Sequence, residues 1–271
     1  MSIANVLGNV ASQFSVARKR PSGFSTACFI EYLRIQARQI FAHRGVTAAP
    51  GSVRIVGAEV TCPNYGALLG LFKEIWLAEQ YYFRTSAPAP LIIDAGANIG
   101  MAVLYFCKQY PSARVLAFEP DPTACAALKK NVQANKLNVT VHQAAVGGEA
   151  GEIDFFSDPA HEAGVSMSAH ATGRLTRRTT VQCVCLSRFI TEPVDLLKLD
   201  VEGSETEVLV ELAASGKLEL VQRLIVEFHE HKGQPRNQLP VILDLLRSFK
   251  IRSTRENNVV MVYAAKGPDE F

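Results

Sequence analysis

The chain of 271 residues has no apolar run long enough to span a membrane, and its start lacks the charged residues, apolar core and cleavage site of a secretory leader. We therefore expect no membrane partner and a cytoplasmic location. The net charge is only +2, and the short basic runs at residues 18–20 and 174–178 have no interleaved aromatic residues for base stacking. Nucleic acid is therefore a poor candidate as a partner.

Paired cysteines are also missing. The six cysteines stand at positions 28, 62, 107, 125, 183 and 185 without the spacing of a zinc site, and a chain with a large core needs no disulfides, so we expect reduced thiols. Internal repeats and low-complexity tracts are absent, while 48% hydrophobic and 20% charged residues are the proportions of an ordinary globular protein. The length suits one α/β domain with an N-terminal elaboration.

A glycine-containing loop after an apolar run is the most informative feature that is present. The apolar residues that precede Asp94 predict a strand covered on both faces, which is typical of parallel sheets. Gly96 and Gly100 then allow a tight turn and a close approach to a ligand. Asn98 stands where a dinucleotide-binding loop has its second glycine, and its amide suits an amino-acid moiety better than a diphosphate. By itself the loop is equally consistent with a structural turn.

An acidic residue downstream strengthens the case for a cofactor. Residues 114–118 predict a second strand, which leads into Glu119 roughly two dozen residues after Gly96. A carboxylate at that place can accept hydrogen bonds from both ribose hydroxyls of an adenosine. The spacing alone does not separate NAD from S-adenosylmethionine, but the loop with Asn98 favours S-adenosylmethionine.

A third predicted strand, residues 194–199, has charges at its carboxyl end. Strand alternation places Lys198 and Asp200 on one face, where the two charges can neutralise each other. They form either a structural ion pair or part of a pocket for cofactor and acceptor. We favour the pocket, because ligands bind at the carboxyl edge of open α/β sheets.

Three segments together resemble the FkbM type of S-adenosylmethionine-dependent methyltransferase: residues 94–100 (DAGANIG), 118–122 (FEPDP) and 197–205 (LKLDVEGSE), the last being the most specific. Residues 143–147 and 225–230 also resemble that family, and the resemblance covers about residues 88–265. It implies a class I, Rossmann-like α/β fold with about seven mostly parallel strands and helices on both faces. It also implies methyl transfer, with an N-terminal helical and hairpin extension to which no motif can be assigned.

The resemblance suggests which residues contact S-adenosylmethionine. We expect the methionine half at Asp94, Gly96, Asn98 and Gly100, the ribose at Glu119, and the adenine edge at Gln143, Ala144 and Ala145. Asp200 is also placed beside the cofactor, and Pro120 fixes the turn after Glu119, while Asp121 can cap the next helix. Tyr81 and Tyr82 either seal the core, which is the commoner role of such aromatics, or cap the methionine end.

Transfer to a hydroxyl also needs a base within reach of the acceptor proton. His229 is our choice because its ordinary pKa lies near neutrality, with Asp200 and Glu227 beside it; the alternative is an exposed loop histidine. For acceptor binding we select Lys198, Glu202, Ser166 and Ser168. We assign no metal, although Mg²⁺ or Mn²⁺ held by Asp200, Glu227 and His229 is a less favoured alternative.

The order of elements predicts residues 1–87 as an extension and residues 88–271 as the methyltransferase domain. In the extension, an apolar stripe of six residues predicts a helix that packs on the core or on a second copy of the chain, which would give a homodimer through the N-terminal helices. A hairpin at 53–60 and a helix at 65–78 follow. In the domain we predict strands at 91–94, 114–118, 139–142, 194–199, 221–227, 249–254 and 259–264. We predict helices at 99–109, 122–135, 205–215 and 237–247, with an insertion or lid at about 147–188.

The function that these residues favour is O-methylation of a hydroxyl on a sugar or secondary metabolite, the acceptor class being implied by the resemblance alone. Three alternatives stay open. The first is N- or O-methylation of a peptide or protein side chain, the second is a non-catalytic binding module with a degenerate methyltransferase fold, and the third is a nicotinamide enzyme.

Overall fold

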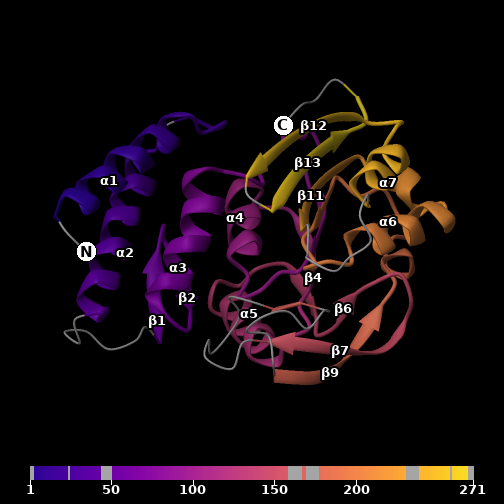
Figure 1. Cartoon of the computed structure of the whole chain (residues 1–271), viewed down its shortest axis with the longest axis horizontal. Helices are drawn as coiled ribbons and strands as arrows, with labels where there is room; N and C mark the ends of the chain where they lie inside the picture. Colours follow the sequence, from indigo (N-terminus) through magenta and orange to yellow (C-terminus); the bar gives the residue numbers. More distant parts are fainter. Residues whose placement is uncertain are drawn as a thin grey trace. The chain divides into compact units, whose positions relative to one another are not determined.

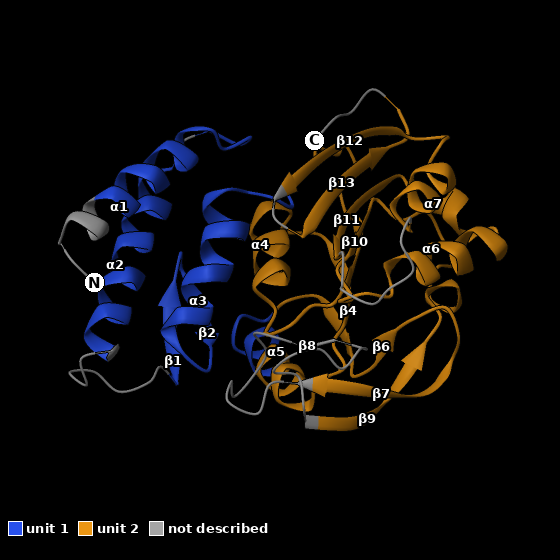
Figure 2. Ribbon diagram, in the orientation of Figure 1, with its two compact units in different colours: residues 1–82, 130–136 blue, residues 83–129, 137–271 orange. Residues whose placement is uncertain are grey.

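The computed structural model describes residues 3–23, 25–43, 51–157, 167–168, 177–229, 238–256 and 258–267. The chain divides into two compact units, which Figure 2 colours separately. Unit 1 comprises residues 1–82 and 130–136, and unit 2 comprises residues 83–129 and 137–271. Within the described ranges, no helix is both long and apolar enough to cross a bilayer.

Unit 1 contains the predicted helices and the predicted hairpin. Its elements are α1 (Ile3–Arg18), α2 (Thr26–His43), β1 (Ser52–Ile55), β2 (Ala58–Thr61), α3 (Tyr65–Leu71) and the π-helix η1 (Phe72–Leu77). Strands β1 and β2 are antiparallel. The segment 130–136 belongs to this unit because Asn131 and Asn135 hydrogen-bond the backbone of β2: Thr61 N donates to Asn131 Oδ1 at 2.6 Å, and Asn135 Nδ2 donates to Glu59 O at 2.7 Å.

The apolar stripe predicted for α2 is not the face that this unit buries. Ile30, Leu33 and Phe41 are 42%, 37% and 48% exposed, whereas Tyr32 and Ile35 are fully buried. Two rows of apolar residues overlap on this helix, and periodicity alone cannot say which row faces inward. The homodimer through these helices stays a prediction.

Seven strands form the central sheet of unit 2 in the order β12-β13-β11-β10-β3-β4-β5. The five strands from β11 to β5 are mutually parallel, and β13 is antiparallel to both of its neighbours. The chain runs from β3 outward to β5 and then returns to β10 on the other side of β3. The strand order therefore reverses between β3 and β10, which is where ligands bind in such sheets. The strands are β3 (Leu91–Ala95), β4 (Arg114–Phe118), β5 (Val139–His142), β10 (Leu196–Leu199), β11 (Arg223–His229), β12 (Lys250–Glu256) and β13 (Val259–Ala265).

Helices cover both faces of this sheet, as predicted. Figure 1 shows α6 (Glu205–Ala214) and α7 (Gln238–Leu245) on one face and α4 (Met101–Gln109) on the other. The core against α6 and α7 joins strand residues such as Leu197 and Val226 to helix residues such as Leu209 and Ile242. Helix α5 (Pro122–Ala134) begins in unit 2 and ends in unit 1, and short 3-10 helices lie at Leu186–Arg188 and Lys217–Leu220.

The predicted positions of the sheet strands agree closely with the structure. The segments 114–118 and 139–142 coincide with β4 and β5, while β10 and β11 begin slightly later than expected because only a single bridge, Val194 to Val221, precedes them.

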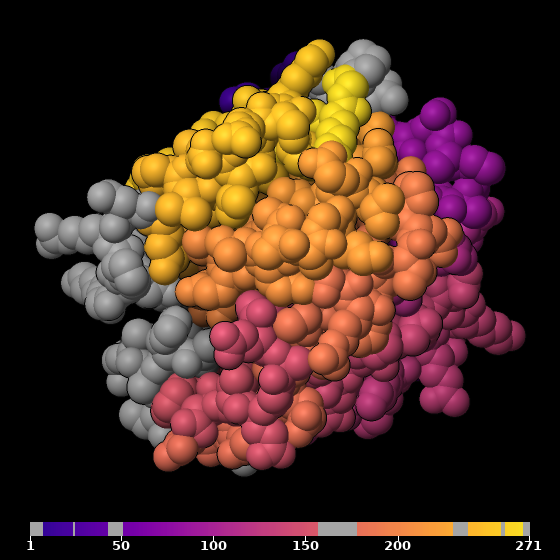
Figure 3. Space-filling view, turned by 90° about the vertical axis from the view of Figure 1, so that its right-hand side faces the viewer, coloured from indigo at the N-terminus to yellow at the C-terminus, as the bar shows by residue number. Residues whose placement is uncertain are grey.

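Figure 3 looks onto the side of unit 2 that carries α6, α7 and the pair β12 and β13. The apolar residues Val210, Val241, Leu243 and Ile251 of α6, α7 and β12 are exposed.

The insertion after β5 forms a second, four-stranded sheet in the order β6-β9-β7-β8. Its strands are β6 (Ala145–Val146), β7 (Gly151–Ser157), β8 (Met167–Ser168) and β9 (Arg177–Val184). Strands β7 and β9 pair antiparallel along their lengths. Residues 158–166 and 169–176, in the middle of the expected insertion or lid, lie outside the described residues, and Ser166 is one of them.

Candidate cofactor and acceptor site

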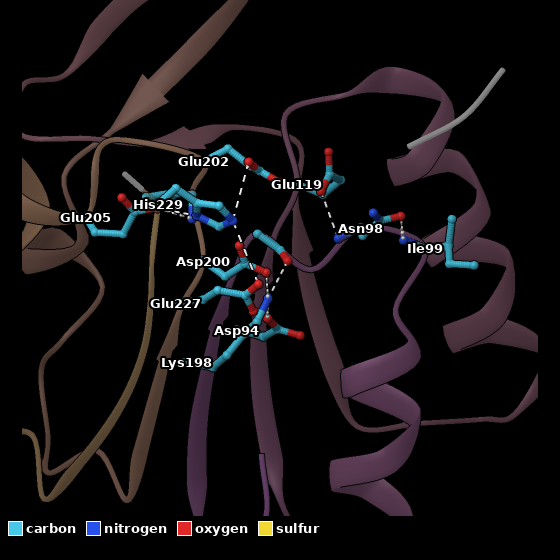
Figure 4. A network of polar contacts seen from close by, with 12 residues as sticks. Asp94, Asn98, Ile99, Glu119, Lys198, Asp200, Glu202, Glu205, Glu227 and His229 are labelled. Atoms are coloured by element: carbon cyan, nitrogen blue, oxygen red, sulfur yellow. Dashed lines mark hydrogen bonds and ion pairs between the residues drawn. The ribbon is translucent and has the colours of Figure 1, made fainter. Parts of the chain in front are cut away.

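Charged side chains meet at the carboxyl ends of β3, β4, β10 and β11, beside the reversal in strand order (Figure 4). Lys198 of β10 lies opposite Asp94 of β3 and Ile225 of β11 in the sheet register. Since alternate residues of a strand share a face, Asp200, Glu227 and the residues named above project to the same side. Strand register alone therefore brings Asp94 and Glu227, which are 133 positions apart in the sequence, to the same side of the sheet.

Lys198 forms the first of two charged centres. Its Nζ lies 3.2 Å from Asp94 Oδ1 and 3.1 Å from Asp200 Oδ2, and it donates to Gly96 O at 2.6 Å. Its side chain is only 4% exposed, and that of Asp94 is fully buried. Burial alone would lower the pKa of Lys198, but Asp200 and Asp94 raise it, so the ammonium stays charged. This burial supports the structural ion pair over a direct contact with an acceptor.

The glycines of the loop are required by internal packing as well. Gly96 has φ +86°, and a Cβ there would lie 1.7 Å from the carbonyl oxygen of Asp200. Gly100 has φ +87°, and a Cβ there would lie 2.5 Å from Leu128 Cδ1. Position 96 therefore excludes any side chain, because the clash is with backbone, whereas at position 100 a side chain would displace Leu128 and strain the left-handed backbone. The loop can follow the end of β10 so closely only because glycine stands at position 96.

Glu119 fixes the other side of the loop. Asn98 N donates to Glu119 Oε2 and Asp121 N to Glu119 Oε1, each at 2.8 Å. Burial raises the pKa of Glu119 to about 7 despite these hydrogen bonds. Each carboxyl oxygen has a second lone pair, which can accept from a ribose hydroxyl. Asp121 caps α5 as expected, since its Oδ1 accepts from Thr123 N at 2.9 Å and Ala124 N at 2.8 Å.

Asp94 retains accepting capacity at the centre of the site. Among the described residues, its Oδ2 has no hydrogen-bond partner, although the carboxyl is fully buried. Burial raises the pKa of Asp94, while the charge of Lys198 lowers it. A buried oxygen without a donor is costly, and the ammonium group of an amino acid is a donor of matching charge. The methionine half of S-adenosylmethionine carries such a group, so these residues fit that cofactor.

His229 forms the second charged centre. Its Nε2 lies 3.6 Å from Glu202 Oε2 and 3.7 Å from Glu227 Oε1, and its Nδ1 lies 3.5 Å from Glu205 Oε1. Burial alone would lower the pKa of His229, but the hydrogen bond to Glu205 and the charges of Glu202 and Asp200 raise it to about 10. The pKa of His229 therefore lies well above its ordinary value near neutrality, because neighbours from three separate elements surround the ring.

Glu202 adds a strained backbone to this centre. Its φ is +57°, in the left-handed region that residues other than glycine seldom adopt. Burial raises the pKa of Glu202 to about 8, with a further increase from Asp200 and a decrease from His229. Its side chain is 40% exposed, more than that of any other member of the centre. Strain of this kind collects at functional sites.

One group of residues in the described part of the chain has the geometry of a metal site. The ligand atoms of Asp200, Glu227 and His229 all lie within 4.8 Å of one another. These are the residues that the sequence analysis named for a metal. Lys198 already pairs with Asp200, and the raised pKa of His229 makes its imidazole a donor rather than a ligand. A metal would therefore have to compete with the Lys198 ammonium for Asp200 and with a proton for His229.

The other residues expected to contact a ligand belong to neither charged centre. Pro120 follows Glu119 directly, and Gln143 is exposed between β5 and β6, while Ala144 and Ala145 are 6% exposed. Tyr81, which is buried, and Tyr82 belong to unit 1, so their role stays a prediction. Ser168 lies in β8, where only the backbone is described.

Two residues of the neighbourhood were missed by sequence reasoning. His142, at the end of β5, stacks on Phe118 at 4.7 Å between ring centroids and touches Phe189 edge-on at 4.8 Å. Burial lowers the pKa of His142, so its ring is neutral. Glu205 belongs to the segment 197–205, which by itself assigns no role to it. A carboxyl at the start of an apolar helix is the signal that could have identified it.

Comparisons with known proteins identify the family of the chain. A family model described as the methyltransferase FkbM domain matches residues 94–253, a range that includes every residue labelled in Figure 4. The protein "Methyltransferase 1" of Beauveria bassiana (strain ARSEF 2860) is 30% identical over 185 residues, which are 60% of this chain and 74% of that protein. The 31-O-demethyl-FK506 methyltransferase FkbM of Streptomyces tacrolimicus is 29% identical over 211 residues, 65% of this chain and 80% of that protein. The 2-O-methyltransferase NoeI of Sinorhizobium fredii (strain NBRC 101917 / NGR234) is 29% identical over 189 residues, 60% of this chain and 74% of that protein.

Proposed function

The chain belongs to the methyltransferase FkbM domain family, and we propose that it methylates a hydroxyl oxygen of a sugar or another secondary metabolite. The family makes it an S-adenosylmethionine-dependent methyltransferase. Two similar proteins are named for O-methylation, a 31-O-demethyl-FK506 methyltransferase and a 2-O-methyltransferase. Those names support a hydroxyl acceptor of small-molecule or glycan type for this chain.

The observation that carries the cofactor assignment is the buried oxygen Asp94 Oδ2, which has no hydrogen-bond partner among the described residues. We expect it to accept from the ammonium of the methionine half, with Glu119 accepting from the ribose. Bound S-adenosylmethionine supplies an activated methyl group that leaves a sulfonium centre on attack by the acceptor. Asp94, Gly96, Asn98, Gly100 and Glu119 would hold it, since alignment contributes most to such a displacement.

The second centre supplies the proton acceptor in this proposal. A hydroxyl must lose its proton as it attacks, and we expect His229, with Asp200 and Glu227 beside it, to take that proton. In the ligand-free protein the pKa of His229 is raised to about 10, and the imidazole is charged at neutral pH. A second positive charge in the site opposes the imidazolium, so the pKa of His229 should fall when a cationic ligand is bound. We expect Glu202, the most exposed acid of this centre, to contact the acceptor.

Calorimetric titration with S-adenosylmethionine tests the cofactor site directly. The variant Asp94→Asn should bind at least about tenfold more weakly than the wild type, because a charged hydrogen bond becomes a neutral one. Asp121→Asn is the matched control and should bind like the wild type, since Asp121 caps α5. Equal affinity in all three proteins would contradict the assignment of Asp94.

The acceptor class is tested by transfer of labelled methyl groups from S-adenosylmethionine. The trial acceptors are methyl glycosides, hexuronates and hydroxylated polyketides on one side and lysine-rich or glutamine-rich peptides on the other. We expect label in the first group as base-stable ethers. Label only in the peptides would favour the side-chain alternative, and no label with intact cofactor binding would favour a binding module.

A further inference from the structure

We propose that Glu205 is the positioning residue of this site, fixing the loop after β10 and turning His229 so that its Nε2 faces Glu202 and Glu227. The inference deepens the proposed function and rests on it, because it assigns the residue that presents the proton acceptor. Glu205 is 1% exposed and lies at the start of α6, and Figure 4 shows it beside His229.

One oxygen of Glu205 holds the loop. Its Oε1 accepts from Gly203 N at 3.0 Å and from Val201 N at 3.3 Å. Between these two donors stands Glu202 with φ +57°, followed by Gly203 with φ +115°. A left-handed residue with a side chain persists only where the surroundings fix it, and the two hydrogen bonds to Glu205 supply that constraint. The side chain of Glu202 is thereby held toward His229.

The same oxygen also orients the histidine. Glu205 Oε1 lies 3.5 Å from His229 Nδ1, so a proton on Nδ1 is favoured. Nε2 is then the nitrogen that faces Glu202 Oε2 at 3.6 Å and Glu227 Oε1 at 3.7 Å. A carboxylate that orients the far nitrogen of an imidazole is a common device for presenting the near one. Glu205 thus connects the end of β10 to the end of β11 through a single atom.

The titration of His229 reports this connection. Its neighbours are Glu205 from α6, Glu202 and Asp200 from the loop and end of β10, and Glu227 from β11. Removal of the Glu205 charge takes away the hydrogen bond at Nδ1 and leaves the other three carboxyls in place. The pKa of His229 should therefore fall, while the Asp94 and Glu119 contacts for the cofactor are untouched.

The experiment measures the pKa and tautomer of His229 by nitrogen NMR of histidine-labelled protein, with the His229→Gln spectrum used for assignment. Glu205→Gln keeps an oxygen that can accept from the loop but loses the charge, and should lower the pKa of His229 by about one unit or more. Glu205→Asp keeps the charge but withdraws it by one methylene, and should give an intermediate pKa. Glu207→Gln, also in the first turn of α6 but exposed, controls for the helix dipole and should titrate like the wild type.

Calorimetry with S-adenosylmethionine on the same proteins separates positioning from general damage. We expect Glu205→Gln to bind within about twofold of the wild type, since one lost neighbour of His229 does not reach Asp94. A pKa of His229 equal to wild type in both Glu205 variants would overturn the proposal, and so would a shift of the same size in Glu207→Gln. If Glu205→Gln does not fold, the pKa of His229 in Glu205→Asp alone decides the test, and a value equal to wild type overturns the proposal. Absence of cofactor binding by the wild type, with the pKa shift intact, would count against the proposed function and not against the positioning of His229.

Discussion

The two charged centres at the end of β10 use similar groups in different ways. In the first, the Lys198 ammonium has three oxygens at 2.6 to 3.2 Å, and its partner Asp94 is fully buried. In the second, His229 has three carboxyl oxygens at 3.5 to 3.7 Å, and Glu202 beside it is 40% exposed. The first centre is close-packed and charge-compensated, while the second is looser and open to solvent.

This difference suggests a structural role for the Lys198 centre and a catalytic role for the His229 centre. Short contacts and full burial fix the geometry of β3 and β10. Lys198 stays protonated near neutral pH, because the carboxylates raise its pKa. Longer contacts and a strained neighbour leave the pKa of His229 and of Glu202 open to change when a ligand arrives. We therefore expect substitution of Lys198 to act mainly on stability and substitutions at the second centre to act mainly on turnover.

The largest effect is expected from Lys198→Ala. Two carboxyls would lose their common partner inside the sheet, and breaking a buried ion pair from one side costs about 3–5 kcal/mol of unfolding free energy. Urea unfolding at pH 7 measures it. The loss should shrink at pH 5, because Asp94, whose pKa burial already raises, can then take up a proton.

Arg114→Ala is the matched control for that loss. Arg114 pairs with Glu192 at 2.8 Å, but both side chains are 48% exposed, and surface pairs contribute little. Its unfolding midpoint should stay close to that of the wild type. If Lys198→Ala were no more destabilising than Arg114→Ala, the first centre would not be the structural support that its burial implies.

At the second centre, His229→Ala should reduce kcat by about 100- to 10,000-fold, the usual contribution of a positioned base. The affinity for S-adenosylmethionine should not fall, because the contacts at Asp94 and Glu119 remain and the variant removes a positive charge that opposes the cofactor. Labelled methyl transfer at saturating cofactor and calorimetry give the two quantities. Unchanged turnover would remove the base assignment and leave a nitrogen acceptor, which needs a base less, as the better alternative.

The sequence predicted the first centre more completely than the second. The run before Asp94, the two glycines and the charged end of β10 are local patterns, and strand alternation alone placed Lys198 beside Asp200. The surroundings of His229 depend on where α6 begins relative to the end of β11, which no periodicity encodes. Its ordinary pKa was therefore a poor guide. In the same way, the apolar residues of α2 predicted a helix correctly but not its buried face.

The smallest effect is expected from metal removal. Asp200, Glu227 and His229 lie close enough for a metal, within 4.8 Å, but Lys198 already neutralises Asp200, and the pKa of His229, raised to about 10, keeps its ring protonated. A metal must displace that proton before the ring can bind it. Treatment with EDTA should therefore leave turnover within about twofold of the untreated protein, and added Mg²⁺ or Mn²⁺ should not raise it. A loss of turnover that Mg²⁺ restores would show that the His229 centre is a metal site. The two centres would then differ in metal binding and not in the protonation of His229.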